Sequence, residues 1–353
     1  MTLSYLVIVA VLVAMVWPME RYETAPGSAS FVSSRLSISG GDASGDVVQV
    51  FEPDGGVRFV TALGSELTPL QAFMGWVDPY VNVQTCEERF GDCEPSISKQ
   101  IQLGAMATAK EVAAYVALTY LGFEATFIEG PAQVGGFDPE LCPVDAPDTR
   151  ACRVLSVGDV LVSIDDTPIE LLSDVSAALA DARVGDVVSV TVHPIGSTDG
   201  ASRTVEVELM ESPSEPGRVI IGFNPRDTRQ VELPITVDID TDSIGGPSAG
   251  LAFTLALIDA LTPGELSPPG GVAVTGTMSA DGTVGPIGAL VQKAVAVRAS
   301  GARLFLVPGA QSVDELAAAR SAAGSGVDIV PVSTLAEALA VLADRGGTPV
   351  EQG

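Results

Sequence analysis

A serine in the last third of the sequence has surroundings that suit a nucleophile. Ser248 lies in the segment Ile244 to Gly250, IGGPSAG, which follows an alternating stretch from Val231 to Asp240 and opens an apolar stretch from Ala249 to Leu261. These patterns predict a strand, a turn and a buried helix. Free backbone N–H groups and the positive end of the helix would favour an oxyanion beside the serine. The residues expected to form this oxyanion turn are Gly245, Gly246 and Ala249.

The second candidate is a lysine, because Ser248 alone is also explained as a helix N-cap. A helix is expected from Gly288 to Ala299, and at about 100° per residue Lys293 lies on its apolar face, while Gln292 and Arg298 lie toward the opposite side. Burial lowers the pKa of a lysine, since the charged form loses its hydration. A neutral Lys293 would be a competent general base for Ser248.

The residue counts disfavour the commoner catalytic arrangements. His193 is the single histidine of the chain, and it falls in a predicted strand of a different segment. A Ser-His-carboxylate triad and a Cys-His dyad both need a histidine in the right place. A serine and lysine pair has no such requirement.

Four short segments in this region resemble the proteolytic domain of the Lon (endopeptidase La) family: Gly246 to Gly250, Thr275 to Thr277, Gly285 to Gly288, and Lys293. The resemblance covers about residues 225–345. It implies a dyad in which Ser248 is the nucleophile and Lys293 the base, with Thr275 as a hydroxyl that hydrogen-bonds near the lysine. It also implies polypeptide substrates, no cofactor, no metal, and a homo-oligomer that is commonly a hexameric ring.

Two departures from the family pattern point to one branch of it. The ATP-dependent members usually carry an acidic residue three positions before the serine, where this chain has Gly245, so the role of that acid is absent or passes to Asp242. No Gly-x-x-x-x-Gly-Lys-Ser/Thr loop occurs in the sequence, so we expect neither an ATPase nor ATP as a partner. The chain thus resembles the ATP-independent, membrane-anchored Lon-like branch, which couples a PDZ-type domain to the protease.

A PDZ-like domain is expected before the protease. The segment Gly158 to Ile169, GDVLVSIDDTPI, and the predicted strands around it resemble a bacterial PDZ domain. By this resemblance Leu121, Gly122 and Phe123 would cap a peptide carboxylate, and the next strand would bind the peptide along its edge. The alternative is that Gly122 only ends the preceding helix.

The N-terminus contains a long apolar run. Leu3 to Met19 is close to the minimum length of a membrane-spanning helix and long for the core of a signal peptide. We expect an uncleaved signal anchor, with a cleaved signal peptide as the alternative and a buried terminal helix as a weaker one. This predicts a single-pass protein of the cell membrane whose bulk is extracytoplasmic.

The cysteines and the net charge bear on compartment and partners. The four cysteines form two close pairs, Cys86 with Cys93 and Cys142 with Cys152. Behind an export-type segment, an even count favours disulfides, whereas the spacing is wrong for a zinc ribbon. A formal net charge of −27 argues against nucleic acid as a partner.

The expected fold class is α+β, with several domains along the chain. They are an anchor or signal peptide (1–20), a small β-rich segment (21–109), a PDZ-like domain (110–212), a Lon-type proteolytic α/β domain (213–345) and a tail (346–353). In the last domain, strands are expected at Arg303 to Val307 and Val327 to Val332. Capping boxes, Ser312 with Glu315 and Thr334 with Glu337, are expected to open two helices.

The main functional hypothesis is a serine endopeptidase that cleaves unfolded or flexible polypeptides outside the cytoplasm without its own ATPase. The alternative is a catalytically inactive, membrane-tethered PDZ and Lon-like scaffold that binds peptides. Both hypotheses use the same domains, and they differ in whether Ser248 and Lys293 react.

Overall fold

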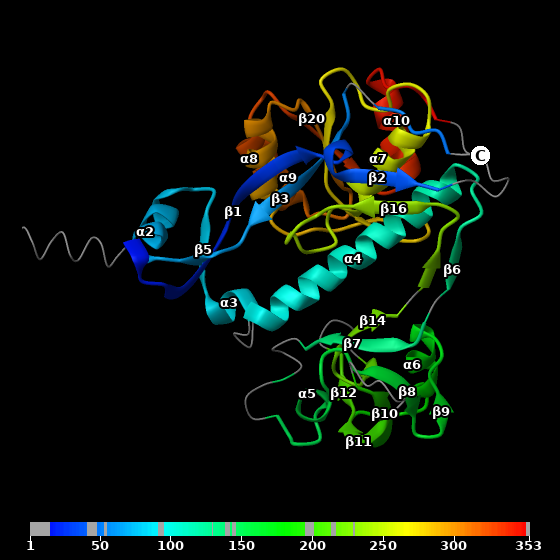
Figure 1. Ribbon diagram of the computed structural model, residues 1–353. Coiled ribbons are helices and arrows are strands. Elements are labelled where there is room, and N and C mark those ends of the chain that lie inside the picture. Colours follow the sequence, from blue (N-terminus) through cyan, green and yellow to red (C-terminus); the bar gives the residue numbers. More distant parts are fainter. Residues whose placement is uncertain are drawn as a thin grey trace, which may run out of the picture. The chain divides into compact units, whose positions relative to one another are not determined.

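The computed structural model describes most of the chain, namely residues 15–40, 48–52, 55–90, 95–128, 130–137, 142, 146–194, 201–212, 217–228 and 230–350. The chain divides into two compact units, which Figure 1 shows in ribbon form. Unit 1 is made of Met1–Thr126 and Leu233–Gly353, and unit 2 of Phe127–Glu232. Unit 2 is thus inserted between the two halves of unit 1.

These divisions differ from the expected boundaries after residues 109 and 212. Residues 21–109, expected as a separate segment, belong to unit 1 together with the C-terminal part of the chain. The reason is strand pairing, because β3 (Val57–Leu63) lies parallel to β17 (Val272–Val274) in one sheet. Helix α4 (Pro95–Tyr120), whose second half was expected to open the PDZ-like domain, packs against α7 (Gly250–Leu261) of unit 1.

The sheet of unit 1 has the strand order β21-β20-β17-β3-β1-β4, with β5 also paired to β1. Strands β3, β17, β20 and β21 are parallel, whereas β1 is antiparallel to β3, β4 and β5. The strands expected at 303–307 and 327–332 are confirmed as β20 and β21. The strands not yet bounded are β1 (Met19–Phe31), β4 (Glu66–Leu67), β5 (Asn82–Thr85), β20 (Leu304–Pro308) and β21 (Asp328–Val332).

Helices cover both faces of this sheet at β3, whose neighbouring residues Phe59 and Val60 are both buried. Val60 packs in a cluster with α8 (Leu290–Ser300) and α9 (Val313–Ala323). Its neighbour Phe59 contacts Phe253 of α7, with the ring centroids 5.8 Å apart. Since successive side chains of a strand point to opposite faces, α7 covers the face away from α8 and α9. A parallel sheet covered on both sides in this way excludes water from its centre.

One of the two expected capping boxes is complete, whereas at Thr334 only the N-cap is found, because the Glu337 carboxylate accepts from the N–H of Ser333 instead. Ser312 accepts a hydrogen bond from the N–H of Glu315 and caps α9, while Glu315 binds back to the Ser312 N–H. Thr334 accepts from the N–H of Glu337 and caps α10 (Leu335–Asp344). Each cap satisfies N–H groups that a helix start leaves without an acceptor.

The strand expected from Val231 to Asp240 is broken in two. It forms β15 (Gln230–Glu232) and β16 (Thr236–Ile239), with Pro234 between them. Proline has no N–H to donate to a ladder, which is the physical reason for the interruption. In unit 1, β16 pairs with β2 (Leu36–Ser39), and the strands β18 (Thr277–Met278) and β19 (Val284–Gly285) form a hairpin.

In its described residues, unit 2 contains one antiparallel sheet, a short two-stranded pair formed by β12 and β13, and two short helices. Its strand order is β11-β10-β8-β7-β14, with β9 paired to β8, and its core holds Leu161, Ile164, Val190 and Val192. Two of the strands predicted after the Gly158 to Ile169 segment are found as β10 and β11. The elements are β6 (Thr126–Ile128), β7 (Ala132–Gly136), α5 (Ala151–Val154), β8 (Val160–Ile164), β9 (Thr167–Pro168), α6 (Leu172–Ala178), β10 (Val187–His193), β11 (Arg203–Glu208), β12 (Met210–Glu211), β13 (Val219–Ile220) and β14 (Asn224–Asp227).

Most of the expected anchor falls on residues 1–14, which lie outside the described residues. Within the part of the chain that the structure describes, no helix combines the length and the apolar character that crossing a membrane requires. The last residue of the apolar run, Met19, opens strand β1.

Of the two expected disulfides, Cys142–Cys152 is confirmed, with Cα atoms 6.0 Å apart. Cys86 is also disulfide-bonded, and Cys93, its expected partner, lies outside the described residues. Among the described side chains, no group of histidine, cysteine, aspartate and glutamate is arranged to hold a metal ion.

Candidate active site

Ser248 lies in the loop between β16 and α7, as the pattern predicted. The helix begins at Gly250, and Ala249 is its N-cap, with no side-chain cap. Ser248 is half-buried. Its hydroxyl is therefore not used as a helix cap, which was the alternative interpretation.

The hydroxyl of Ser248 lies beside the amine of Lys293. Lys293 sits in the first turn of α8 with its side chain pointing inward, and the residue is 4% exposed. Its Nζ donates to Ser248 Oγ over 2.8 Å and to Thr275 Oγ1 over 3.1 Å. Burial lowers the pKa of the Lys293 amine to about 8, because the ammonium form loses its hydration.

Thr275 joins the serine and the lysine. It follows β17 directly and is fully buried. Its hydroxyl donates to the backbone carbonyl of Ser248 over 3.0 Å and accepts from Lys293. The N–H of Gly276 donates to the same carbonyl over 2.8 Å. The end of β17 therefore fixes the backbone of the serine and the head of the lysine together.

Helix α4 supports the glycine turn before the serine. The N–H of Gly246 donates to the backbone carbonyl of Gln102 in α4 over 2.7 Å, so this N–H is already engaged. Among the described residues, the N–H groups of Gly245, Ser248 and Ala249 have no protein acceptor. These three, rather than Gly246, remain as donors of the expected oxyanion turn.

The space beside Gly245 is filled by the same helix. A Cβ at this position would lie 2.7 Å from the Cβ of Gln102 and 3.0 Å from its backbone carbon. Any side chain here requires α4 to move, which is a physical reason for glycine at the position where ATP-dependent Lon enzymes carry an acid.

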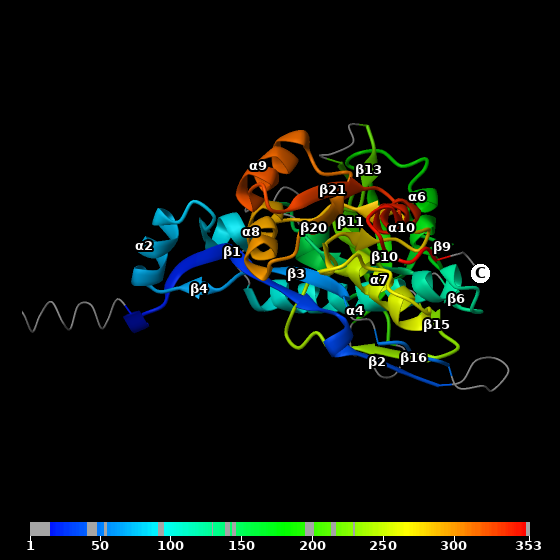
Figure 2. The ribbon, with the colours of Figure 1, turned by 90° about the horizontal axis from the view of Figure 1, so that it is seen from above.

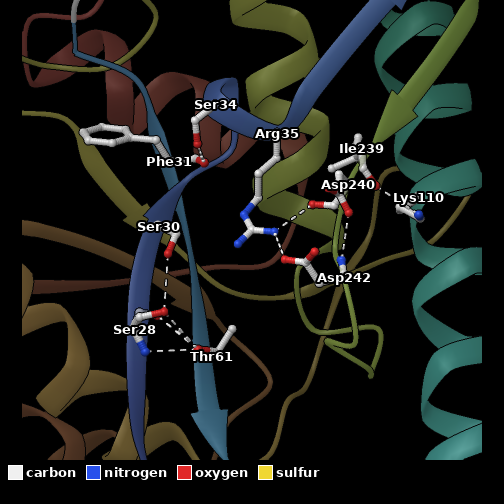
Figure 3. Close-up of polar contacts among 10 residues, drawn as sticks. All are labelled: Ser28, Ser30, Phe31, Ser34, Arg35, Thr61, Lys110, Ile239, Asp240 and Asp242. Carbon is white, nitrogen blue, oxygen red and sulfur yellow. Dashed lines mark hydrogen bonds and ion pairs between the residues drawn. The ribbon is translucent and has the colours of Figure 1, made fainter.

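Asp242, the other residue considered for the role of that acid, binds elsewhere. Figure 3 shows Arg35 reaching across from the start of β2, where its Nη1 donates to Asp242 Oδ2 over 2.8 Å and to the carbonyl of Asp240 over 3.0 Å. On the other side of the loop, Lys110 of α4 donates to the carbonyl of Ile239 over 3.0 Å. Asp242 thus helps to fix the loop that leads to Ser248.

Two glutamines of the site were not found from the sequence. Gln102 contributes a backbone carbonyl, which carries no signal of its own. Gln311, 7% exposed, binds both polar groups of the Ile287 backbone, accepting its N–H at Oε1 over 2.9 Å and donating from Nε2 to its carbonyl over 3.1 Å. Ile287 precedes α8, so Gln311 positions the helix that carries Lys293. A glutamine just before the capping box at Ser312 is a weak signal for such a role.

Leu121, Gly122 and Phe123 form the end of helix α4. Gly122 has φ = 82°, and the Phe123 N–H donates to the carbonyl of Leu118 over 3.0 Å. This is the geometry of a left-handed helix C-cap, the alternative interpretation of these residues. All three belong to unit 1.

Comparison with solved structures finds local likenesses to two small proteins, one of which is a PDZ domain. The PDZ domain of an SdrC-like protein from Listeria monocytogenes is 18% identical, with a TM-score of 0.21, and the match covers 27% of this chain and 87% of that one. The solution structure of GtR34C from Geobacillus thermodenitrificans is 25% identical, with a TM-score of 0.19, over 22% and 86%.

Comparison with curated proteins finds Lon proteases. The Lon protease of Phenylobacterium zucineum is 29% identical over 54% of this chain and 23% of its own length. That of Chloroflexus aggregans is 28% identical over 47% and 21%, and that of Xanthomonas oryzae 35% over 45% and 18%. The chain thus spans less than a quarter of the length of these relatives.

The family match falls on the site itself. Residues 225–344 match the Lon protease (S16) C-terminal proteolytic domain, and this range contains Ser248, Thr275 and Lys293. Residues 225–344 are thus similar to a Lon-type proteolytic domain, and most of this range, from Leu233 onward, belongs to unit 1.

Proposed function

We propose that the chain is a serine endopeptidase in which Ser248 is the nucleophile and Lys293 the general base. The observation that carries this proposal is the 2.8 Å contact between a buried amine and a serine hydroxyl inside a Lon-type proteolytic domain. The pKa of about 8 leaves a useful fraction of Lys293 neutral near physiological pH.

The reaction uses the lone pair of the neutral amine. Lys293 accepts the hydroxyl proton as Ser248 Oγ bonds to the carbonyl carbon of the scissile peptide. The resulting ammonium then protonates the leaving amine, the C–N bond breaks, and an acyl-enzyme remains. Lys293, again neutral, takes a proton from water, the hydroxide attacks the ester, and Ser248 recovers its proton.

The oxygen of the tetrahedral intermediate needs donors. The N–H groups of Ser248 and Ala249 at the start of α7 serve this purpose, since no described residue accepts from them. Each such donor typically contributes about 3 kcal/mol to the transition state. Thr275 keeps the amine aimed at Ser248 throughout, because it is bonded to both residues.

We also propose substrates that are already unfolded or flexible, with no ATP step in this chain. This is supported by the absence of a phosphate-binding loop from the sequence. Attachment to the cell membrane with the bulk of the chain extracytoplasmic is proposed from the apolar run Leu3 to Met19, and the Cys142–Cys152 disulfide is consistent with an oxidising compartment. A homo-oligomer, hexameric as in many Lon proteins, is proposed from the family resemblance.

The proposal is tested with a fluorophosphonate probe and casein cleavage. Ser248→Ala should abolish both, and Lys293→Met, which keeps the length of the side chain, should abolish cleavage because no base remains. Lys99→Met is the matched control, since Lys99 is exposed on α4. ATP should leave the cleavage rate unchanged.

Labelling and cleavage that persist in both site variants would refute the assignment of Ser248 and Lys293. An unmodified, assembled chain that neither reacts with the probe nor cleaves casein would support the inactive scaffold instead.

A further inference from the structure

Helix α2 (Pro69–Val77) packs with its small residues inward and its large apolar residues outward. Ala72 and Gly75 are its buried residues. Gly75 lies so close to β5 that a Cβ would meet Val83 Cγ2 at 2.7 Å. The exposed fractions of its large apolar residues are 39% for Leu70, 60% for Phe73, 64% for Met74, 63% for Trp76 and 70% for Val77. A contiguous apolar surface of this kind is typical of an interaction site.

A second exposed apolar group lies at the same end of strand β1. Met15, Val16 and Trp17, just before β1, are 51%, 76% and 68% exposed. The first residue of β1, Met19, pairs with Leu67 of β4, two positions before α2 begins. Figures 1 and 2 both show α2 beside the start of β1, away from α7 and α10.

The chemistry of this surface fits the interfacial layer of a lipid bilayer. Residues 67–77 include no lysine, arginine, aspartate or glutamate, although the chain carries a net charge of −27. The two tryptophans of the chain, Trp17 and Trp76, both lie here, and tryptophan is enriched at membrane interfaces. The apolar run Leu3 to Met19 ends where β1 starts, so a chain held in a bilayer by that run would bring α2 to the lipid surface.

We infer that α2 lies in the membrane interface as a second contact, with Phe73, Met74, Trp76 and Val77 among the lipid chains. The inference rests on the proposed membrane attachment through the N-terminal run. It adds that α2 fixes unit 1 against the bilayer, because two separate contacts restrict rotation about a single tether. The contact is apolar rather than electrostatic, since residues 67–77 have no basic side chain to bind anionic lipids.

The test uses the full chain with Trp17→Phe, which leaves Trp76 as the sole tryptophan. The protein is mixed with phosphatidylcholine vesicles whose acyl chains are either brominated or unmodified. We expect the emission of Trp76 to shift to shorter wavelengths, brominated chains to quench it, and high salt to leave both effects unchanged. Co-flotation of the protein with the vesicles measures, in the same samples, whether the chain binds the membrane through any of its segments.

Phe73→Ser with Val77→Ser should abolish the shift and the quenching while flotation persists. Both side chains are exposed, so the fold is not at risk. Val313→Ser is the matched control, because Val313 is 83% exposed on α9 of the same unit. With Val313→Ser, the emission of Trp76 and its quenching should equal those of the protein that carries Trp17→Phe alone.

Three results would overturn the inference, and each has its own signature. If the protein floats with the vesicles but the emission of Trp76 is neither shifted nor quenched, the N-terminal run is the membrane contact and α2 does not bind lipid. If the protein does not float with the vesicles, the proposed membrane attachment is wrong as well. This result would not bear on the proposed peptidase activity, which is measured separately. A shifted Trp76 without vesicles, in an oligomer that Phe73→Ser dissociates, would show that a second copy of the chain covers α2.

Discussion

Lys293 is kept weakly basic by its burial, and no charged partner among the described side chains offsets this effect. Its polar contacts are the two hydroxyls of Ser248 and Thr275, and it is almost fully buried. Neutral hydroxyls stabilise an ammonium far less than a carboxylate does. The acidic loop residue Asp242 is held by Arg35 instead. Burial therefore lowers the pKa of the Lys293 amine to about 8, and Asp242 does not form an ion pair with it.

The pH dependence of cleavage should follow this amine. We expect kcat/KM to rise about tenfold per pH unit below pH 8 and to level off above it, because the neutral form of Lys293 is the base. A fluorogenic peptide assayed from pH 6 to 9.5 measures this profile. A profile that is flat over this range, or that falls between pH 7 and 8, would contradict the assignment of the base.

Thr275 is expected to act as a positioning residue. Thr275→Val removes the hydroxyl that bonds both Ser248 and Lys293, so we expect kcat to fall roughly ten- to thirtyfold from the loss of hydrogen bonds worth about 1 kcal/mol each. The pH midpoint should also fall, because the ammonium loses an acceptor.

Thr275→Ser keeps the hydroxyl and is the control, with most of the activity and an unchanged midpoint. Equal losses in both variants would point to packing rather than to the hydroxyl.

At the scale of elements, the loop before Ser248 is held by segments far apart in the chain. Helix α4 bonds Gly246 and Ile239 through Gln102 and Lys110, and Arg35 at the start of β2 bonds Asp242. Most of these contacts use backbone carbonyls or N–H groups. These bonds hold the loop at several points, which suits a site that is proposed to present free N–H groups.

Gly245 should not tolerate a side chain. In Gly245→Ala, the Cβ would meet the backbone of Gln102 at 3.0 Å, so α4 must shift away from the turn. We expect the free energy of unfolding to fall by about 1–3 kcal/mol and kcat/KM to fall at least about tenfold. Thermal unfolding and peptide cleavage measure the two effects.

Gly288→Ala is the matched control, because nothing lies within 4 Å of a Cβ at that position. If the two variants behave alike, contact with α4 is not the reason for glycine at position 245.

At the scale of the molecule, the proteolytic domain needs the first third of the chain. The family match begins at residue 225, yet β17 pairs with β3, and α7 packs against both β3 and α4. A fragment of residues 225–345 would expose the faces of α7 and α8 that Phe59 and Val60 cover. We expect this fragment to show no cooperative thermal unfolding by itself.

Co-expression of the fragment with residues 15–126 should restore a cooperative transition, because the missing strands and α4 return. The same strand segment carrying Phe59→Ser and Val60→Ser is the control and should not restore it. A cooperative transition in the fragment alone would contradict this account of the sheet.

The stability of unit 1 should depend on pH through Asp259. This carboxyl is 1% exposed in α7; Oδ1 accepts the Leu266 N–H over 2.8 Å, and Oδ2 has no partner among the described residues. Burial raises its pKa to about 6. The folded protein therefore holds this proton more tightly than the unfolded chain, and stability from this group is lost as pH rises from about 4 to 6.

Asp259→Asn keeps an acceptor for Leu266 and removes the charge. We expect it to be more stable than the unmodified chain by about 2 kcal/mol at pH 7.5, with the difference shrinking toward pH 4. Urea unfolding at both pH values measures it, with Asp238→Asn on the exposed side of β16 as the control. A difference that is constant with pH would exclude the charge as its cause.

Local features were predictable from the sequence by itself. The turn at Ser248, the inward face of Lys293, the caps at Ser312 and Thr334 and the Cys142–Cys152 pair depend on residues close together in the chain. Periodicity and turn chemistry act over this range, so they leave a readable pattern.

Only the tertiary structure decided which distant segments complete the site. The pairing of β3 with β17, the bond from Gly246 to Gln102 and the binding of Ile287 by Gln311 join positions with no shared periodicity. The first two form between backbone groups, which nearly every residue type carries, and the third binds a backbone far away in the sequence. The sequence alone therefore identified Ser248 and Lys293 as a candidate pair, and the fold decided which segments hold the pair in place.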